Sequence, residues 1–213
     1  MYLPADFEEQ RPEVLHAALR DHPLGLPITQ DADHALDVNP LPFLLDAAHG
    51  PHGRLRGHVA RANPVWRKAS TQDRTLVVFQ GPQVYVSPGW YPSKAETGKA
   101  VPTWNYVTVL ARGRLRVIDD KAWLRTLVGE LTAHHEAAQT TPWSMDDAPP
   151  EYIDAMLSAI VGIEIEIDSL QGKWKVSQNR AASDREGVAA ALARGDEAQA
   201  AMAALVIARG PAR

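Results

Sequence analysis

An alternation of apolar and acidic residues near position 165 most strongly constrains how this chain can fold. In the stretch VGIEIEID, residues 161–168, the odd positions are apolar and the even positions include Glu164, Glu166 and Asp168. Successive side chains of a strand point to opposite faces, so this pattern predicts a half-buried β-strand. Antiparallel sheets commonly have one solvated face, and we expect the three acids there, along a solvent-facing strand edge.

Other runs rich in β-branched and aromatic residues predict further strands. They are GRLRGHVA, TLVVFQG, QVYVSP and TWNYVTVLARGRLRVI, and the third is expected as a separate strand after the break at Gly81–Pro82. The last run, residues 103–118, is too long for one flat strand, so a bulge or a tight turn is expected near Gly113. Residues 24–45 are expected to form short strands separated by Asp, Asn and Pro turn signals.

Helical signals flank these strands. Pro12 is a favoured first-turn residue, and apolar residues follow it at helical spacing until Pro23. Asp119 or Asp120 can cap a second helix. The apolar face of that helix is predicted to contain Trp123, Leu124, Leu127, Val128 and Leu131. A third, short helix is expected over residues 151–160.

The carboxyl-terminal part changes to an alanine-rich composition. The sequence SDRE, residues 183–186, fits a capping box with Ser183 at the cap, and Gly195 and Asp196 predict a stop and a restart between two helices. We therefore expect an α+β fold, with a strand-rich barrel and peripheral helices. The predicted organisation is a barrel domain over residues 1–180 and a helical extension over residues 181–213.

The composition excludes several classes of protein. The chain has no cysteine, which rules out disulfides, thiolate metal sites and cysteine nucleophiles and favours the cytoplasm. It has no run of 18 apolar residues, so no membrane span is expected. Its net charge of -4 argues against a strongly basic nucleic-acid coat.

Several motifs that resemble catalytic or metal sites are incomplete. QGKWKV lacks the first glycine and the Ser or Thr of a phosphate loop, and DADHALD lacks the glycine and glutamate of a calcium loop. His134 and His135 are adjacent, so on a helix their side chains diverge by about 100°. No metal site is predicted, and no catalytic residue is assigned.

Four polar and aromatic clusters are candidates for ligand binding. They are GHVARANPVW (57–66), FQGPQVYVSPGWYPSK (79–94), VPTWNYV (101–107) and GKWKVSQNR (172–180). Their cations can hold phosphate, and their amides and hydroxyls can form further hydrogen bonds. A ligand with a planar ring and a phosphate, such as flavin mononucleotide (FMN), would use this set.

Each of these residues also has a purely structural interpretation. Aromatic residues at strand ends close a core, and lysines beside them cover its rim. Arg61 is the hardest to explain in this way, because it lies in a strand-like run flanked by alanines. A phosphate at Arg61 would explain both its charge and its small neighbours. The alternative is a structural arginine paired with an acid such as Glu164.

Seven ordered stretches of the chain resemble the PaiB family of FMN-binding negative transcriptional regulators. They are MYLPADF, GHVARANP, FQGPQVYVSPGWYPSK, VPTWNYVTV, PWSMDDAPPEYIDAML, IVGIEIEI and GKWKVSQNR, and together they span nearly the whole sequence. ADHALDVNPLPFLL fits the family more loosely, with departures at His34 and at residues 37–39. No site residue is inferred there.

The resemblance implies an FMN-binding split β-barrel of the pyridoxamine-phosphate-oxidase-like kind, with peripheral helices. Barrels of that superfamily dimerise and hold FMN in a groove between subunits. HVARANP is similar to the stretch that receives the flavin phosphate. The expected cofactor-binding residues are His58, Arg61, Asn63, Ser87, Lys94, Trp104, Asn105, Lys173, Lys175, Ser177 and Gln178.

The implied function is that of a homodimeric, flavin-dependent sensor that represses transcription. Two alternatives stay open: a flavin-dependent oxidoreductase of the split-barrel class, and a haem-binding split barrel in which His58 or His134 and His135 would matter. No helix-turn-helix with a basic recognition helix is evident. DNA binding by the protein alone is therefore expected to be weak or dependent on a partner.

Overall fold

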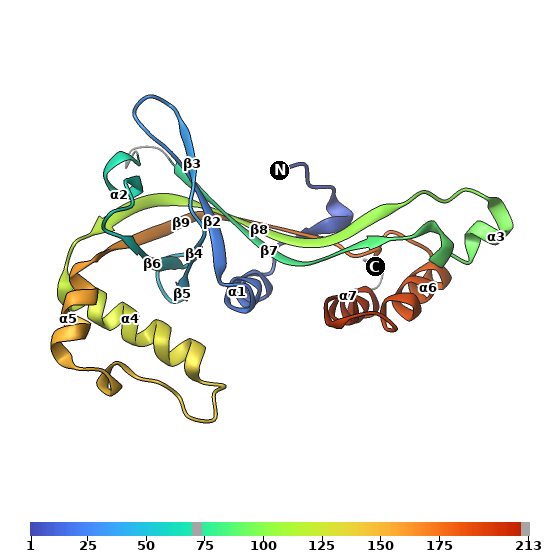
Figure 1. The fold of residues 1–213 in the computed structure, drawn as a ribbon. Coiled ribbons are helices and arrows are strands. Elements are labelled where there is room, and N and C mark those ends of the chain that lie inside the picture. The colour runs from blue at the N-terminus through green and yellow to red at the C-terminus, as the bar shows by residue number, and fades with distance from the viewer. Residues whose placement is uncertain (70–73, 210–213) are drawn as a thin grey trace. The chain divides into compact units, whose positions relative to one another are not determined.

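The computed structural model describes residues 1–69 and 74–209, and the chain divides into two compact units (Figure 1). The first unit comprises Met1–Asp21, Gln80–Val109 and Gln171–Arg213, and the second comprises His22–Phe79 and Leu110–Leu170. Three long strands contribute residues to both units. They are β7 (Arg74–Val86), β8 (Thr103–Ile118) and β9 (Ile160–Lys175).

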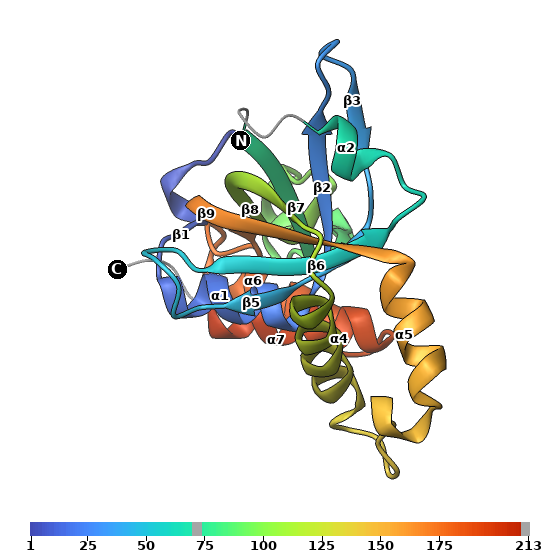
Figure 2. The same cartoon turned by 90° about the vertical axis from the view of Figure 1, so that its left-hand side faces the viewer.

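Nine strands of the described residues form one sheet, in the order β3-β2-β7-β8-β9-β6-β5, with β1 paired to β9 and β4 paired to β2. The shorter strands are β1 (Glu8–Glu9), β2 (Leu24–Gln30), β3 (Leu36–Val38), β4 (Leu41–Pro42), β5 (Leu44–Asp46) and β6 (Arg54–Ala60). Figure 2 shows β5, β6 and β9 side by side, and their pairings are antiparallel. Strands with peripheral helices confirm the predicted α+β class.

The core of the second unit follows from the alternation along its strands. In β6, Leu55, Gly57 and Val59 are buried while the residues between them are half-buried, as a strand with one covered face requires. Across β9, Ile163 lies opposite Gly57 and is 1% exposed. After β6 the chain forms the short helix α2 (Val65–Lys68).

Two helices of the second unit pack on one another. They are α4 (Lys121–Glu136) and α5 (Pro150–Ser158), joined through the 3₁₀ turn η3 (Met145–Asp147). Asp120 caps α4, since its Oδ1 accepts the N–H of Trp123 at 2.8 Å. Leu124, Leu127 and Leu131 are buried, which confirms the predicted apolar face.

Two helices of the first unit, α1 (Pro12–Asp21) and α7 (Glu197–Ala208), begin where the sequence predicts. The other helical elements of this unit are η1 (Ala5–Phe7), η2 (Pro88–Trp90), α3 (Ser93–Thr97) and α6 (Ala182–Leu192). Asp196 caps α7 by accepting the N–H of Gln199 at 2.9 Å, which confirms the predicted restart. No helix in the described part of the chain has both the length and the apolar content to cross a membrane.

The predicted cap of α6 is wrong. The helix begins at Ala182, with Ala181 in the cap position, so Ser183 lies inside the first turn. Asp184, which is 5% exposed, fixes this turn because its carboxylate accepts the N–H and the O–H of Ser93 at 3.0 and 2.8 Å.

Two long strands are less interrupted than predicted. β7 continues through Gly81 and Pro82, so the break expected there is wrong, and β8 runs unbroken past Gly113, so the turn is wrong as well. A strand can contain proline where the missing N–H lies outside the ladder. Gly113 serves a close approach instead, because a Cβ there would lie 2.0 Å from the carbonyl oxygen of Glu166.

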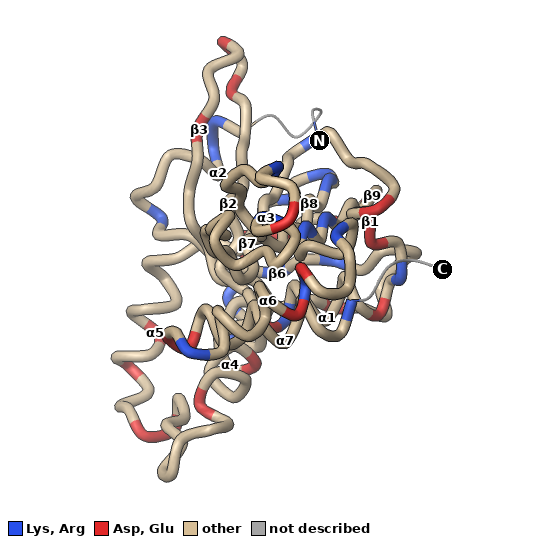
Figure 3. Tube along the Cα trace, turned by 90° about the vertical axis from the view of Figure 1, so that its right-hand side faces the viewer, with Lys and Arg blue, Asp and Glu red and all other residues tan. Residues whose placement is uncertain are grey.

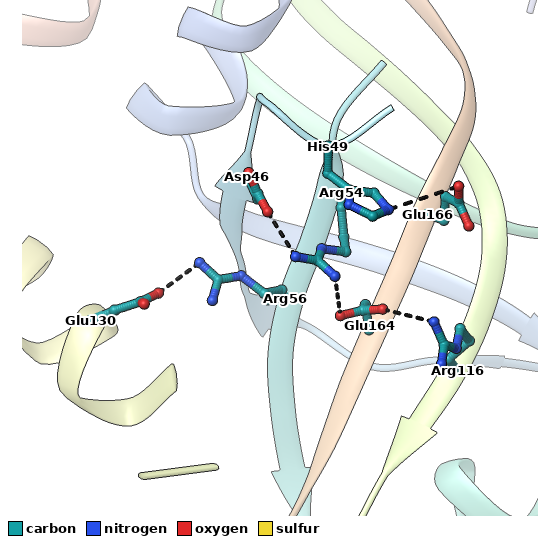
Figure 4. A network of polar contacts seen from close by, with 8 residues as sticks. All are labelled: Asp46, His49, Arg54, Arg56, Arg116, Glu130, Glu164 and Glu166. Carbon is teal, nitrogen blue, oxygen red and sulfur yellow. Dashed lines mark hydrogen bonds and ion pairs between the residues drawn. The ribbon is translucent and has the colours of Figure 1, made fainter. Parts of the chain in front are cut away.

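The acids of β9 do not follow a solvent-facing edge. β9 lies between β8 and β6 in the sheet, and the Glu164 side chain is only 4% exposed. Its carboxylate accepts hydrogen bonds from Arg54 at 3.0 Å and from Arg116 at 3.4 Å (Figure 4). Arginines from neighbouring strands thus make burial of this acid possible, whereas Glu166 remains 55% exposed.

Candidate functional site

The carboxyl-terminal end of β9 carries two lysines on one face in the first unit. Lys173 and Lys175 are two residues apart, and strand geometry directs their side chains to the same side. The Nζ of Lys173 donates to the carbonyl oxygen of Tyr2 at 3.1 Å. It also lies 5.6 Å from the ring centre of Tyr2 and 5.3 Å from that of Tyr106, within range of cation–π attraction.

Lys175 is held by β8. Its Nζ donates to the hydroxyl of Thr103 and to the carbonyl oxygen of Trp104, both at 2.5 Å. Burial lowers the pKa of Lys175, and the positive charges of Lys173 and Arg180 lower it further. These three residues are called the cationic cluster below.

No ion pair within the described residues neutralises the charge of the cationic cluster. Arg180 lies over the ring of Tyr91 at 5.1 Å, and the two lysines contact neutral oxygens and rings. Across residues 1–69 and 74–209, none of the three cations forms an ion pair with a carboxylate. An anionic ligand would therefore find its charge complement here.

An aromatic groove adjoins the cationic cluster in the same unit. The groove has a volume of about 260 Å³ and is lined by Gln80, Gly81, Gln83, Trp104, Tyr106, Val107 and Thr108. Trp104 is 53% exposed, and Tyr85 packs edge-on against it with ring centres 6.2 Å apart. Tyr106 both lines the groove and contacts Lys173, so this residue links the groove to the cationic cluster.

Three of the predicted site residues support this surface from within. Asn105, which is 1% exposed, donates its Nδ2–H to the hydroxyl of Ser177 at 2.9 Å. Ser177 has a φ of 66°, a backbone conformation that residues other than glycine rarely adopt. Gln178 holds this turn, since its amide oxygen accepts the N–H of Val176 at 2.8 Å and its amide nitrogen donates to the carbonyl oxygen of Trp174.

On the opposite face of the end of β9, Glu9 binds two arginines, and Glu9, Arg11 and Arg209 are together called the clamp. Glu9 accepts hydrogen bonds from Arg11 at 2.9 and 2.7 Å and pairs with Arg209 at 2.6 Å. The guanidinium of Arg209 in turn lies 4.5 Å from the ring centre of Trp174. The clamp therefore joins β1, the end of β9 and the residue that follows α7.

The clamp predicts an acid-sensitive component of stability. Burial by itself would raise the pKa of Glu9, but hydrogen bonds from Arg11 and Arg209 outweigh it and lower the pKa from 4.5 to about 2. Because the folded-state pKa is depressed, this stability is complete above pH 4.5 and is lost as the pH falls towards 2. The free energy of unfolding lost over this pH range is about 3 kcal/mol.

The measurement is urea unfolding as a function of pH, with the variant Glu9→Gln. The parent is expected to lose stability between pH 5 and pH 2, and the variant should lose about 3 kcal/mol less over that range. Glu8→Gln, at an exposed neighbouring position, is the matched control. Equal pH dependence of the parent and Glu9→Gln would contradict the role of the clamp.

Ser87 and Lys94, two predicted site residues of the first unit, do not bond to the lysines of the cationic cluster in the described residues. The hydroxyl of Ser87 accepts the N–H of Gly89 at 3.2 Å and caps η2. Lys94 is exposed on α3. Among the described residues, no hydrogen bond or ion pair joins the side chain of either one to Lys173 or Lys175.

Arg61, in the second unit, has a full set of partners. Its Nη1 and Nη2 donate to the carboxylate of Asp119 at 2.8 and 2.6 Å, and its Nε donates to the carbonyl oxygen of Ser158 at 2.9 Å. The hydrogen bonds between them raise the pKa of Arg61 and lower that of Asp119. The acid at Arg61 is thus Asp119, while Glu164 binds other arginines. The phosphate role of Arg61 stays a prediction, and a phosphate there would have to displace Asp119.

The two neighbours of Arg61 in the predicted site differ from each other. Asn63 donates to the side-chain oxygen of Asn39 at 2.7 Å and accepts the N–H of Val65 at 2.9 Å. The Nδ1 of His58 is buried and has no hydrogen-bond partner among the described residues, and burial lowers the pKa of this histidine. Their roles in ligand binding stay predictions.

Sequence reasoning missed the residues that complete these sites. Tyr2 and Thr103 contact the two lysines through a carbonyl and a hydroxyl, for which no sequence pattern exists. The sequence contains a weak indication that Asp119 has another partner. Asp119 and Asp120 are adjacent, and the helix that follows needs only one of them as its cap. In the described residues, no group of three or more His, Asp or Glu side chains could hold a metal ion.

Comparison with known proteins identifies the family of this chain. Residues 1–169 match the family described as "Putative FMN-binding domain". A protein of Aspergillus fumigatus is 36% identical over 232 residues, covering 88% of this chain and 89% of that protein. The "Protease synthase and sporulation protein PAI 2" of Bacillus subtilis is 30% identical over 188 residues, covering 86% of this chain and 85% of PAI 2.

A solved structure shows the same fold at low sequence identity. The flavocytochrome Anf3 of Azotobacter vinelandii superposes with a TM-score of 0.58 and 14% identity, over 79% of this chain and 69% of that one. Its likeness concerns the fold alone, which is the split β-barrel predicted from the sequence. The family match over most of the chain and the relationship to PAI 2 make this chain a member of the FMN-binding domain family to which PaiB belongs.

Proposed function

We propose that this chain binds FMN on the aromatic groove and the cationic cluster of its first unit. The observation that carries the proposal is their link through Tyr106: an exposed aromatic wall adjoins cations that, among the described residues, form no ion pair with a carboxylate. The donor set fits FMN, because a planar ring can stack on Trp104 or Tyr106 and a phosphate can bind ammonium groups. When bound, the flavin would supply redox chemistry.

Two lysines are proposed to hold the phosphate. Lys175 is already oriented by Thr103 and Trp104, which reduces the entropy lost when it binds an anion. A phosphate would also relieve the mutual repulsion with Lys173 that lowers the pKa of Lys175. Asn105, Ser177 and Gln178 would act beneath this contact by keeping the turn after β9 in place.

A homodimer would complete the site. The groove of one chain measures about 260 Å³, whereas pockets that enclose ligands of this size span roughly 300–1,000 Å³. A second copy that covers the exposed Trp104 and Tyr85 would enclose the flavin and remove aromatic surface from water. We therefore propose a dimer whose partner chain supplies the missing wall.

The proposed biological role is that of a cytoplasmic, PaiB-like negative regulator of transcription that responds to flavin state. The support is kinship with PAI 2 over 86% of the chain. Acidic residues outnumber basic ones by 26 to 22 in the whole sequence, so strong electrostatic attachment to DNA by this protein alone is not expected. A protein partner would then provide or strengthen the contact with DNA.

The test is an FMN titration of the purified protein, followed by visible absorption and sedimentation. We expect saturable binding with a yellow flavin spectrum and a mass of two chains. Failure to bind FMN would overturn the proposed site, and a single-chain mass with bound FMN would overturn the dimer. A haem spectrum, or steady consumption of a reduced nicotinamide by the flavin-loaded protein, would favour one of the alternative functions.

A further inference from the structure

The part of the second unit formed by α4, α5 and the segment between them, residues 121–158, carries an apolar groove. It is called the arm groove here and has a volume of about 430 Å³. One wall is formed by small residues at every fourth position, Gly129 and Ala133 of α4 and Ala137 at its C-cap. Trp143 and Met145 line the groove from the following segment, and Trp143 is 44% exposed.

The arm groove is preformed. Met145 packs against the small core that Leu124, Ile153 and Leu157 build between α4 and α5. The N–H of Trp143 donates to the carboxylate of Glu136 at 3.0 Å, which ties the segment to α4. A groove whose walls are already ordered costs little conformational entropy when it is filled.

The segment that carries the arm groove has more acidic than basic residues. Beyond Lys121 and Arg125 at the start of α4, residues 126–158 contain no Lys or Arg but six acids: Glu130, Glu136, Asp146, Asp147, Glu151 and Asp154. Figure 3 shows acidic positions along α4, α5 and the segment that joins them.

Only some of these acids are neutralised within the unit. Glu130 pairs with Arg56, and Asp154 pairs with Lys121 and Arg125. Glu136 and Asp146 line the groove and, among the described residues, have no ion-pair partner. The groove therefore combines an apolar floor with an acidic, unpaired rim.

We propose that the arm groove docks a cationic amphipathic helix of a partner protein. Such a segment would place apolar side chains against Ala133 and Trp143 and basic side chains beside Glu136 and Asp146. An amphipathic helix laid into a hydrophobic groove is a common mode of recognition, and complementary charge sets its specificity. The inference concerns residues of the second unit and does not depend on flavin binding.

The experiment measures fluorescence anisotropy of a labelled peptide of about 18 residues, five helical turns, with Leu and Lys at amphipathic spacing. The full-length protein should bind it at about 0.15 M salt, where exposed charges are partly screened. Ala133→Arg places a bulky cation in the groove and should weaken binding at least about tenfold. Ala122→Arg, on the exposed start of the same helix, is the matched control and should leave binding unchanged.

A second variant guards against a change in folding. Asp146→Lys reverses one rim charge without altering the groove floor and should weaken binding and its salt dependence together. The proposal is overturned if the peptide does not bind, or if a peptide of the same composition in scrambled order binds equally well. It is also overturned if Ala133→Arg splits a dimer in sedimentation, because a second copy of the chain would then cover the groove.

Discussion

Replacement of Lys175 by methionine is expected to weaken FMN binding by a factor of about 10 to 150 while riboflavin binding changes little. A hydrogen bond to a charged group contributes about 1.5–3 kcal/mol, which corresponds to that range of affinity. The effect is expected to be specific for the phosphate, because in the proposed site the ammonium group of Lys175 would bind the anion while Trp104 and Tyr106 would provide the surface for the ring. Fluorescence titrations with FMN and with riboflavin check the prediction.

The controls separate charge from fold. Lys99→Met makes the same change at an exposed position of the same unit and should leave both affinities unchanged. Lys175→Arg keeps the positive charge and should retain most of the FMN affinity. Equal loss of riboflavin and FMN in Lys175→Met would show that Lys175 maintains the fold of the site. Unchanged FMN affinity would exclude it as a phosphate ligand.

The same titration tests the phosphate role predicted for Arg61. If a phosphate displaces Asp119, Arg61→Ala should lower the affinity for FMN and not for riboflavin. If Arg61 serves only Asp119 and the carbonyl groups around it, the variant should change stability and leave both affinities intact.

The variant Glu164→Gln is expected to destabilise the protein by about 2–4 kcal/mol. Removal of one partner of a buried ion pair costs about 3–5 kcal/mol, and the partial exposure of Arg54 and Arg116 reduces that cost. Glu164 connects these two arginines, and Arg54 also pairs with Asp46 at 2.8 Å (Figure 4). The neutral amide would leave the arginines without their shared counter-charge.

Urea unfolding monitored by tryptophan fluorescence measures this effect. Glu166→Gln is the matched control on the same strand, because Glu166 is 55% exposed and its only described ion pair is a 3.9 Å contact with His49. Glu166→Gln should lower the free energy of unfolding by less than about 0.5 kcal/mol. If the two variants unfold at the same urea concentration, the buried network contributes no more than a surface charge does.

The local sequence determined most of the secondary structure of this protein. Alternation along residues 161–168, the apolar spacing after Pro12 and the cap at Asp120 each correspond to an element that the structure contains. These signals depend on neighbours a few residues away, and such interactions are present in the sequence itself. The α+β class followed from these patterns and the split-barrel fold from the resemblance to the PaiB family, and both are confirmed.

Tertiary structure decided which of the polar residues pair with one another. Glu164 and Glu166 are equivalent in the alternating pattern, yet one is buried between arginines from other strands and the other is exposed. Arg61 looked free in its run of alanines, but Asp119, distant in sequence, binds its guanidinium. Lys173 and Lys175 form no ion pair among the described residues, although the pairing of β1 with β9 places Glu8 opposite Lys173. Ion pairs between distant residues depend on the folded path of the chain, so local periodicity does not contain them.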